Sequence, residues 1–590
     1  MQQLTSFYGN EIKKYDEQLT RVKKQLFASS MLRLALFCIS AIGIYLLFGT
    51  LKWALALLLI SIVVFLFLVT RHANLQRKRD LLQALIAVNN TELRVLDRDF
   101  HDLPEGNEFK DPSHYFSQDI DLFGRGSFYQ YTNRTALRHG SEIFAGLLKE
   151  NTIENIGPKQ EAIKELAKMP EWRQNFSAIA SLAKTETRTA NIINWLTTYT
   201  SFVPRAMRYL PVVFSGITVL LFVLYFMNML PESMLIVWLV VGIGLCGIYM
   251  KKIIQLGDNA SRAQSIFQQY NQLLVRIEET DFSSEYLKIL KRQVLHETEK
   301  TSSILKKFSK LLNSLDKNSN MLYLIFANGF FLRSLTHCYA TEAWIQKHGN
   351  SVEKWFETIA FFDAYNSLGN FAFNHPTYTF PILKRGEVLL KSKGAGHPLL
   401  DPDKMVLNDL EIDNEQFFII TGANMAGKST FLRTVSLQIV MANIGLPVCA
   451  EKVEYTPIKL ITSMRTTDSL TDDESYFFSE LKRLKFIVDE IQKDRYFIIL
   501  DEILKGTNST DKAKGSRKFV ERLVASKSTG IIATHDLSLC EVANELSQIE
   551  NHYFDAEIID NELHFDYKFK EGICKNMNAS FLLKKMEIVN

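Results

Sequence analysis

The chain has 590 residues, of which 47% are hydrophobic, and its 68 Lys and Arg nearly balance its 65 Asp and Glu. This length exceeds what one hydrophobic core supports, so we expect several structural units. A net charge of +3 supplies no broad basic surface for nucleic acid, although a local basic face is compatible with it. The six cysteines include no C-x-x-C pair, which argues against a disulfide framework or metal site and favours a reducing compartment.

Residues 1–30 repeat apolar side chains at alternating steps of four and three, with charged residues between them. This spacing predicts an amphipathic helix. The apolar positions are Tyr8, Ile12, Tyr15, Leu19, Val22 and Leu26. Two interpretations stay open: a coiled-coil-like seam, or a surface helix that packs on its own domain.

Two pairs of charge-free segments follow, one in residues 31–71 and one in residues 210–250. Leu34–Thr50 and Trp53–Thr70 form the first pair, and a short turn at residues 231–233 divides the second. With its flanks, each segment is long enough to cross roughly 30 Å of hydrocarbon as a helix. The pattern predicts four transmembrane helices in two hairpins, and therefore a lipid bilayer as partner. Buried core helices are the alternative.

Basic residues crowd the outer flanks of these segments, and the two tight inter-helix loops hold only Lys52. The flanking residues are Lys23, Lys24, Arg33, Arg71, Arg77, Lys78, Arg79, Arg205, Arg208, Lys251 and Lys252. By the positive-inside rule, both ends of the chain lie in the cytoplasm. We therefore expect a multi-pass protein of the cell inner membrane or plasma membrane, anchored rather than forming a substrate pathway, since the apolar faces hold no ionisable residue.

The remaining chain divides into helical and strand-like parts. Residues 72–205 and 251–375 have mostly helical patterns, with a Gly/Pro/Asp-rich break at about 101–127. Strand patterns begin only near Pro376. The sequence therefore predicts a C-terminal α/β domain over residues 376–590.

Residues 417–432, FFIITGANMAGKSTFL, join an apolar strand pattern to a Gly-rich loop and a helix-forming segment. The pattern G-x-x-x-x-G-K-[ST] predicts a phosphate-binding loop, because glycines let successive backbone N–H groups turn toward phosphate oxygens. We expect Lys428 to reach the β/γ-phosphates of ATP and Ser429 to bind Mg²⁺. The predicted nucleotide-binding residues are Gly422, Ala423, Asn424, Met425, Ala426, Gly427, Lys428, Ser429 and Thr430.

Two later strand patterns end in polar residues. The apolar run 496–500 ends in Asp501 and Glu502, and the run 530–533 is followed by Thr534 and His535. Hydrolysis of Mg-ATP needs one acid for the metal and another to activate the attacking water. We predict that Asp501 binds the metal, that Glu502 is the general base and that His535 senses the γ-phosphate. A structural role is the alternative for the histidine.

The segments TGANMAGKSTFLRT, DEILKGTNSTDK and ATHD together resemble the ATPase domain of the MutS DNA mismatch-repair family. Further matches in the same order are Gly396-His397-Pro398, residues 445–450, residues 468–480 (DSLTDDESYFFSE) and residues 567–572, followed by Ser580 and Met586. Upstream, residues 119–148 and 355–373 resemble the beginning and end of that family's helical core. The commonest motif is not followed at Ala423, Ala426, Leu504 and Asn508.

This resemblance implies a P-loop NTPase domain of the ABC/MutS type, preceded by an all-α core that the predicted transmembrane helices interrupt. It also implies a homodimer in which Ser475 of one subunit faces the γ-phosphate bound by its partner. Tyr567 falls where the family places an aromatic side chain near adenine, with a strand-face tyrosine as the alternative. We find no N-terminal mismatch-reading domain, and no Phe-x-Glu sequence sits in a suitable folded context for a wedge, so direct mismatch recognition has little support.

Three functions stay open for the predicted ATPase. The first is ATP-dependent DNA binding of the repair or recombination type, which predicts basic side chains around the central space of a dimer. The second is a mechanical ATPase at the membrane that acts on an unknown protein partner. The third is a transporter, which the uncharged helices and short loops oppose.

Overall fold

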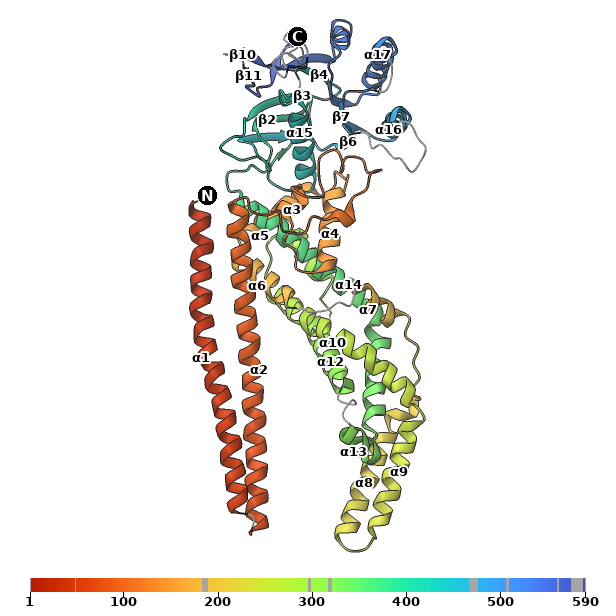
Figure 1. Ribbon diagram of the computed structural model, residues 1–590. Coiled ribbons are helices and arrows are strands. Elements are labelled where there is room, and N and C mark those ends of the chain that lie inside the picture. The colour runs from red at the N-terminus through yellow and green to blue at the C-terminus, as the bar shows by residue number, and fades with distance from the viewer. Residues whose placement is uncertain are drawn as a thin grey trace.

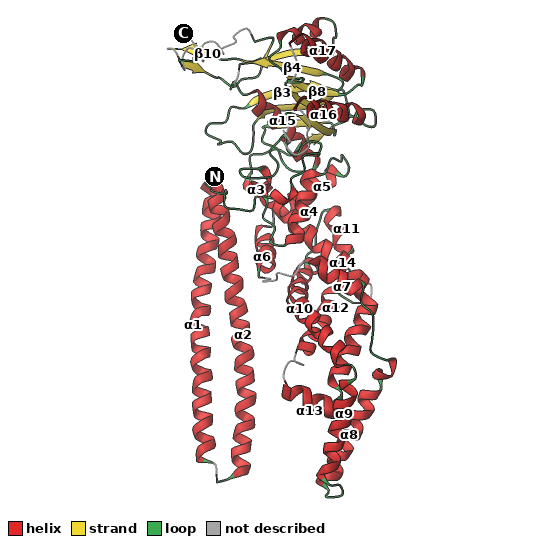
Figure 2. Ribbon diagram, turned by 45° about the vertical axis from the view of Figure 1, so that its right-hand side comes forward, coloured by secondary structure: helices red, strands yellow, loops and turns green. Residues whose placement is uncertain are grey.

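The computed structural model describes residues 2–47, 49–182, 189–295, 299–316, 321–423, 425–465, 476–505, 509–559, 562–574 and 587–588. Two helical arms extend from one side of a mixed α/β domain (Figure 1). Colouring by secondary structure places every strand at that end of the molecule (Figure 2). A helical N-terminal part with mixed sheets at the C-terminus is therefore confirmed. The domain limits given above stay predictions.

The N-terminal helices are α1 (Gln2–Leu46), α2 (Leu51–Leu96), α3 (Phe128–Thr132), α4 (Arg138–Lys149), α5 (Ile156–Ala167), α6 (Pro170–Ser181) and α7 (Thr189–Thr197). They are followed by α8 (Leu210–Phe226), α9 (Glu232–Gly247), α10 (Met250–Glu279), α11 (Glu285–Arg292), α12 (Thr301–Asp316), α13 (Met321–Phe331) and α14 (Arg333–Asn374). The C-terminal part contains α15 (Lys428–Asn443), α16 (Tyr476–Glu490), α17 (Ser509–Ala525) and the 3₁₀ segment η4 (Leu537–Asn544).

The strands are β1 (Ile382–Leu383), β2 (Val388–Ala395), β3 (Asn408–Asp413), β4 (Phe417–Gly422), β5 (Lys452–Tyr455) and β6 (Lys459–Ser463). They continue with β7 (Tyr496–Asp501), β8 (Thr529–Ala533), β9 (Ile549–Phe554), β10 (Glu557–Ile559), β11 (Glu562–His564) and β12 (Lys570–Glu571).

Helices α1 and α2 form a long antiparallel hairpin (Figure 1). The apolar spacing of residues 1–30 has a direct structural explanation, since Tyr15, Leu19 and Val22 pack in one buried cluster with residues of α2 and α6. Tyr8 is also buried, and its hydroxyl donates a hydrogen bond to Asn374 Oδ1 at 2.7 Å. The segment therefore packs within its own chain, along α2 and against α6.

The prediction of four transmembrane helices is wrong. Among the described residues, only α1 and α2 are long and apolar enough to cross a membrane, or three spans if α9 and α10, bent by 66°, are counted as one. Helices α8 and α9 have 17 and 16 residues, which gives each roughly 25 Å of length against a hydrocarbon core of about 30 Å. This finding also overturns the predicted localisation as a multi-pass protein of the cell inner membrane or plasma membrane.

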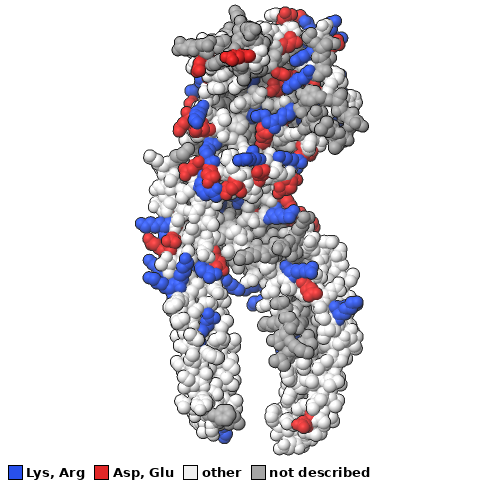
Figure 3. Space-filling model, viewed as in Figure 1, with Lys and Arg blue, Asp and Glu red and all other residues white. Residues whose placement is uncertain are grey.

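The second apolar pair contacts a neighbouring helix, α13, over part of its surface. Thr218 of α8 donates a hydrogen bond to the carbonyl oxygen of Phe330 in α13 at 2.6 Å, and Trp238 of α9 donates to the Thr218 hydroxyl at 2.9 Å. The Trp238 ring stacks on Phe214 with ring centroids 4.3 Å apart. The apolar composition of residues 210–250 thus reflects, in part, contacts between helices. On the face seen in Figure 3, the far halves of both arms carry few charged side chains.

The larger sheet has six strands in the order β12-β9-β4-β8-β7-β6, all parallel except β12. Successive residues of β4 and β7 are buried on opposite faces: Phe418 and Phe497 belong to the cluster that contains α15, while Phe417 and Ile498 belong to the cluster that contains α16 and α17. Burial on both faces explains the continuous apolar runs of these strands. Strand β8 lies between β4 and β7, where Gly530 pairs with Phe417 on one side and Ile498 on the other.

The smaller sheet has the order β1-β5-β2-β3. A long segment before α3 contacts the larger sheet: the carbonyl oxygen of Tyr115 accepts a hydrogen bond from the backbone N–H of Thr462 at 2.9 Å. Asp119, which is 5% exposed, accepts a hydrogen bond from the Thr462 hydroxyl. The Gly/Pro/Asp-rich break at about 101–127 therefore joins the helical part to the α/β part.

Candidate functional site

The loop between β4 and α15 has backbone geometry suited to an anion. Gly422 and Gly427 have φ of 153° and 105°, and Met425 between them has φ of 67°. A Cβ at Gly422 would lie 2.6 Å from the carbonyl oxygen of Phe554, so that position has room only for glycine. Helix α15 begins directly after Gly427 and points its free N–H groups and positive dipole end at the loop.

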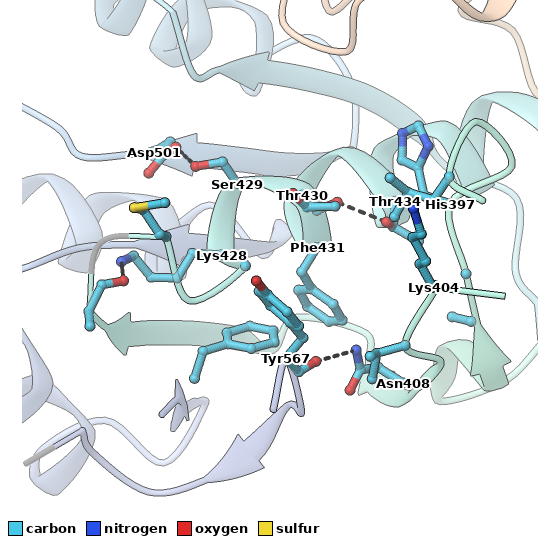
Figure 4. Close-up of a pocket in the computed structure, with 18 of the residues that line it drawn as sticks. His397, Lys404, Asn408, Lys428, Ser429, Thr430, Phe431, Thr434, Asp501 and Tyr567 are labelled. Atoms are coloured by element: carbon cyan, nitrogen blue, oxygen red, sulfur yellow. Dashed lines mark hydrogen bonds between the residues drawn. The ribbon is translucent and has the colours of Figure 1, made fainter. Parts of the chain in front are cut away.

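The loop borders an open pocket of about 750 Å³ (Figure 4). The pocket is lined by residues of the predicted loop, the acidic strand and the C-terminal segment: Ala423, Met425, Gly427, Lys428, Ser429, Thr430, Asp501, Glu502, His535 and Tyr567. Gly422, at the end of β4, and Ala426, within the loop, are both buried. Asn424 and Ser475 lie outside the described residues, so their predicted roles stay predictions.

The Lys428 ammonium is held inside the loop. Its Nζ donates to the carbonyl oxygens of Gly422 at 2.7 Å and Ala423 at 3.0 Å, and the residue is only 6% exposed. Burial lowers the pKa of Lys428, while the nearby carboxylates of Asp501 and Glu502 oppose that shift. The loop thus holds a positive charge at the place where its N–H groups converge.

Ser429 and Asp501 meet although 72 positions separate them in the chain. The Ser429 hydroxyl, on the first turn of α15, donates to Asp501 Oδ2 at 2.8 Å, and Asp501 is the last residue of β7 (Figure 4). Both side chains reach the pocket because β4 and β7 run parallel and end at the same edge of the sheet. Two hard oxygen atoms therefore stand side by side next to the phosphate-binding loop.

Glu502 is held by residues from two neighbouring elements. His535 Nε2 lies 2.9 Å from Glu502 Oε1, and Lys505 Nζ lies 3.8 Å from Oε2. The hydrogen bond from His535 is the main cause that lowers the pKa of Glu502 to about 2. Glu502 also adopts φ of 51°, and its backbone N–H donates to the carbonyl oxygen of Ala533 at 2.9 Å. The carboxylate is therefore ionised and fixed in direction.

Tyr567 lies in the loop between β11 and β12 rather than on a strand face. Its φ is 52°, and the Asn408 side chain holds this backbone from both sides: Nδ2 donates to the Tyr567 carbonyl oxygen at 3.0 Å, and Oδ1 accepts the Phe569 N–H at 2.8 Å. Tyr567 is 42% exposed, and its ring approaches Gly427 at the start of α15 (Figure 4). An aromatic face is thus available beside the phosphate-binding loop.

Three residues near the site carried no predicted role. Glu480 of α16 is buried and accepts the backbone N–H of Lys505 at 3.0 Å, which ties α16 to the segment after β7. Asn408 positions Tyr567 as described above. Glu480 and Lys505 both lie within segments that resemble the MutS family, but no local pattern reveals that one binds the other. Asn408 is brought to Tyr567 by the tertiary fold, and no sequence pattern marks it.

Comparison with known proteins places this site in a family. The family described as MutS domain V matches residues 418–587, which contain the loop, the acidic strand and Tyr567. This match confirms the predicted resemblance to the MutS family over the C-terminal part of the chain.

The MutS relatives match mainly over the same part of the chain. The DNA mismatch repair protein MutS of Thermotoga petrophila is 31% identical over 234 residues, which are 39% of this chain and 29% of that protein. The MutS protein homolog 4 of Homo sapiens is 30% identical over 210 residues, or 34% of this chain and 22% of that protein. The DNA mismatch repair protein MutS of Clostridium novyi is 29% identical over 274 residues, 45% of this chain and 28% of that protein. The chain thus spans less than a third of the length of these relatives.

Proposed function

We propose that this MutS-family chain is an ATPase with a P-loop NTPase domain of the ABC/MutS type. The observation that carries the proposal is the convergence of Lys428, the Ser429–Asp501 pair and the Glu502–His535 pair on one pocket. A phosphate-binding loop, a pair of metal-binding oxygens and an oriented carboxylate are the parts that hydrolysis of a nucleoside triphosphate requires. The aromatic side chain of Tyr567 supports a nucleotide base as the other end of the ligand.

The donor set fits Mg²⁺. The Ser429 hydroxyl and the Asp501 carboxylate are hard oxygen ligands 2.8 Å apart, and Mg²⁺ takes one or two such ligands together with phosphate oxygens and water. The described residues contain no cluster of three or more His, Cys, Asp or Glu side chains able to hold a metal alone, which agrees with a metal shared with a nucleotide. When bound, Mg²⁺ neutralises the charge on the β- and γ-phosphates.

The chain's own residues then divide the remaining work. The N–H groups at the start of α15 and the Lys428 ammonium bind the phosphates and stabilise the charge that develops on them. Glu502 accepts a hydrogen bond from the attacking water and directs its lone pair at the γ-phosphorus. Because the pKa of Glu502 is about 2, its role is to orient the water rather than to keep the proton. His535 fixes the direction of that carboxylate and, as a residue that lines the pocket, would sense the γ-phosphate.

We also propose a homodimer whose nucleotide sites are completed across the interface by Ser475 of the partner. The support is the resemblance of residues 468–480 to the MutS signature segment, whose last five residues form the start of α16. Mixing Ser475→Ala with Lys428→Ala subunits tests it. If sites are composite, turnover recovers partly in the mixture, because some dimers retain one intact site. Turnover that stays at the mean of the separate variants contradicts the dimer proposal.

The names of the relatives favour ATP-dependent DNA binding of the repair or recombination type as the role of this ATPase. DNA binding needs basic side chains, and Figure 3 shows Lys and Arg gathered where the arms join the rest of the molecule. A second candidate is action on a protein partner. It is favoured by the exposed apolar side chains of α1 and α2, such as Trp53 and Phe67, which are 70% and 66% exposed.

One experiment separates these roles. ATP turnover of the purified full chain is measured without DNA and with perfect, mismatched and branched duplex at low salt, with retention of each DNA measured in parallel. Turnover that rises with one DNA, together with retention that weakens as salt increases, supports the DNA role. Turnover indifferent to every DNA, with no retention, eliminates that role and leaves the protein partner. If the chain neither binds nor hydrolyses ATP, the ATPase proposal itself fails.

A further inference from the structure

The end of the α1–α2 hairpin contacts a wall of the candidate nucleotide pocket. Helix α2 ends at Leu96, and Arg98 follows in the left-handed region with φ of 64°. This backbone turn directs the guanidinium toward the α/β part, where it donates to the carbonyl oxygens of Pro398 at 3.2 Å and Leu400 at 2.5 Å. Two hydrogen bonds from one planar group fix both ends of a short segment at once.

That segment is part of the pocket. His397 and Leu400 both line it, as does Lys404 in the turn that follows (Figure 4). A local hydrogen bond also holds the segment after His397: the Leu399 N–H donates to His397 Nδ1, with 3.3 Å between the two nitrogen atoms. Arg98 thus supports the pocket wall, and it is not itself among the described residues that line the pocket.

Arg98 also contacts residues that hold the α1–α2 hairpin against the rest of the helical part. We call this set of contacts the seat of the hairpin. Its guanidinium lies 5.5 Å from the centre of the Tyr131 ring, and the Tyr131 hydroxyl lies 2.9 Å from His375 Nε2 at the end of α14. Farther along α2, Asn89 and Gln174 of α6 exchange hydrogen bonds at 2.9 and 3.3 Å, and Asn89 is fully buried. Arg98 is therefore the link between this seat and the wall of the pocket.

We propose that Arg98 is a positioning residue that makes the affinity of the pocket for nucleotide depend on how the α1–α2 hairpin is seated. This inference rests on the proposed ATP-binding function. When the hairpin sits as described, Arg98 holds the wall at residues 397–400 in the form that accepts a nucleotide. When the seat is disturbed, the two carbonyl groups lose their donor and the wall is free to relax, so the bound form is less populated.

The first test uses the full chain and a fluorescent ATP analogue. Arg98→Ala should raise the dissociation constant roughly 5- to 20-fold, the size of a moderate coupling between sites, while turnover at saturation changes less than twofold. Arg98→Lys should raise the dissociation constant less than Arg98→Ala does, because the lysine ammonium group can still donate to one of the two carbonyl oxygens. Arg94→Ala is the matched control: Arg94 lies one turn earlier on α2, and the ion pairs it forms with described residues are those with the exposed Asp99 and Asp102.

The second test is a double-mutant cycle with Asn89→Ala, which disturbs the seat without touching the pocket. Asn89→Ala should weaken nucleotide binding when Arg98 is present and have little further effect when Arg98 is already alanine. Equal effects in both backgrounds would overturn the proposal, as would an Arg98→Ala variant that is folded but indistinguishable from Arg94→Ala. If the unmodified chain binds no nucleotide, the ATP-binding proposal fails, and that outcome is distinct from either of these.

Discussion

The carboxylate of Asp119 accepts the backbone N–H of Arg465 at 2.9 Å across 346 positions of sequence. Its second oxygen accepts the Thr462 hydroxyl, and its own carbonyl oxygen accepts Arg433 Nε of α15 at 3.2 Å. The nearby Asp121 pairs with the guanidinium of Arg465. One short segment of the helical part therefore bonds both to the helix that begins at the phosphate-binding loop and to the end of β6.

Replacing Asp119 by alanine should destabilise this junction. Because Asp119 is 5% exposed, its loss leaves buried donors unpaired, and we expect the free energy of unfolding to fall by about 2–4 kcal/mol. Urea unfolding followed by tryptophan fluorescence measures the change. Asp111→Ala is the control in the same segment, since the Asp111 side chain accepts hydrogen bonds from its near neighbour Ser113 and its removal should cost less than about 1 kcal/mol. Equal losses in both variants would show that Asp119 does not hold the junction.

Glu502→Gln should separate binding from hydrolysis. The amide keeps the size of the side chain but cannot direct the attacking water as a carboxylate does, so turnover should fall roughly 10²- to 10⁴-fold. The dissociation constant for an ATP analogue should stay within a few-fold of the original value. Glu541→Gln, an exposed carboxylate on η4, is the control and should leave turnover unchanged. Normal turnover in Glu502→Gln would refute the proposed role.

The Glu502–His535 pair also predicts a pH dependence of stability. The pKa of Glu502 is about 2 against an ordinary value of 4.5, with the hydrogen bond from His535 as the main cause. A lowered folded-state pKa stabilises the fold above the unfolded value, so the contribution is complete above pH 4.5 and is lost as the pH falls from 4.5 through about 2. The difference in free energy of unfolding between the natural chain and Glu502→Gln should be constant above pH 4.5 and change below it. A constant difference throughout that lower window would contradict the assignment.

Gly140 and Gly146 offer a matched pair on α4. A Cβ at Gly140 would lie 2.2 Å from Asp363 Oδ2, and Asp363 is fully buried in α14, where it accepts the Leu137 N–H at 2.8 Å. Gly140→Ala should therefore cost about 1–3 kcal/mol through overpacking. Among the described residues, no atom lies within 4 Å of a Cβ at Gly146, so Gly146→Ala should leave stability unchanged or raise it by up to about 1 kcal/mol. Thermal unfolding midpoints compare the two, and equal midpoints would speak against the close packing of α4 on α14.

Asn408→Ala should weaken nucleotide binding without removing any residue that lines the phosphate end of the pocket. The amide holds Tyr567 at a φ of 52°, and its loss leaves that loop to rearrange. We expect a dissociation constant about 5-fold higher, equivalent to one hydrogen bond. Asn414→Ala is the control, because Asn414 bonds to the carbonyl oxygens of Gly386 and Glu387. Tyr567→Ala should show a loss at least as large, and a smaller one would contradict this arrangement.

Local pattern was sufficient to predict the elements that carry the candidate site. Residues 417–432 form a strand, loop and helix where expected, and the apolar run that ends at Asp501 is a buried parallel strand. The contact between Arg98 and Leu400 spans 302 positions and leaves no mark on local sequence. Residues 210–250 were misjudged for a different reason: hydropathy records that a segment is apolar, but it does not fix where its helices begin and end, and α8 and α9 have only 17 and 16 residues.

The position of β8 between β4 and β7 gives Gly530 a particular importance. A Cβ there would lie 2.3 Å from the carbonyl oxygen of Ile498 and 2.9 Å from the Phe417 ring, so the strand that carries the phosphate-binding loop and the strand that carries Asp501 close on this one residue from both sides. Any larger residue at Gly530 would therefore clash with both β4 and β7, and at least one of these strands would have to shift. Ser429 follows β4 on the first turn of α15 and Asp501 ends β7, so a displacement of either strand would change the 2.8 Å separation of their side chains.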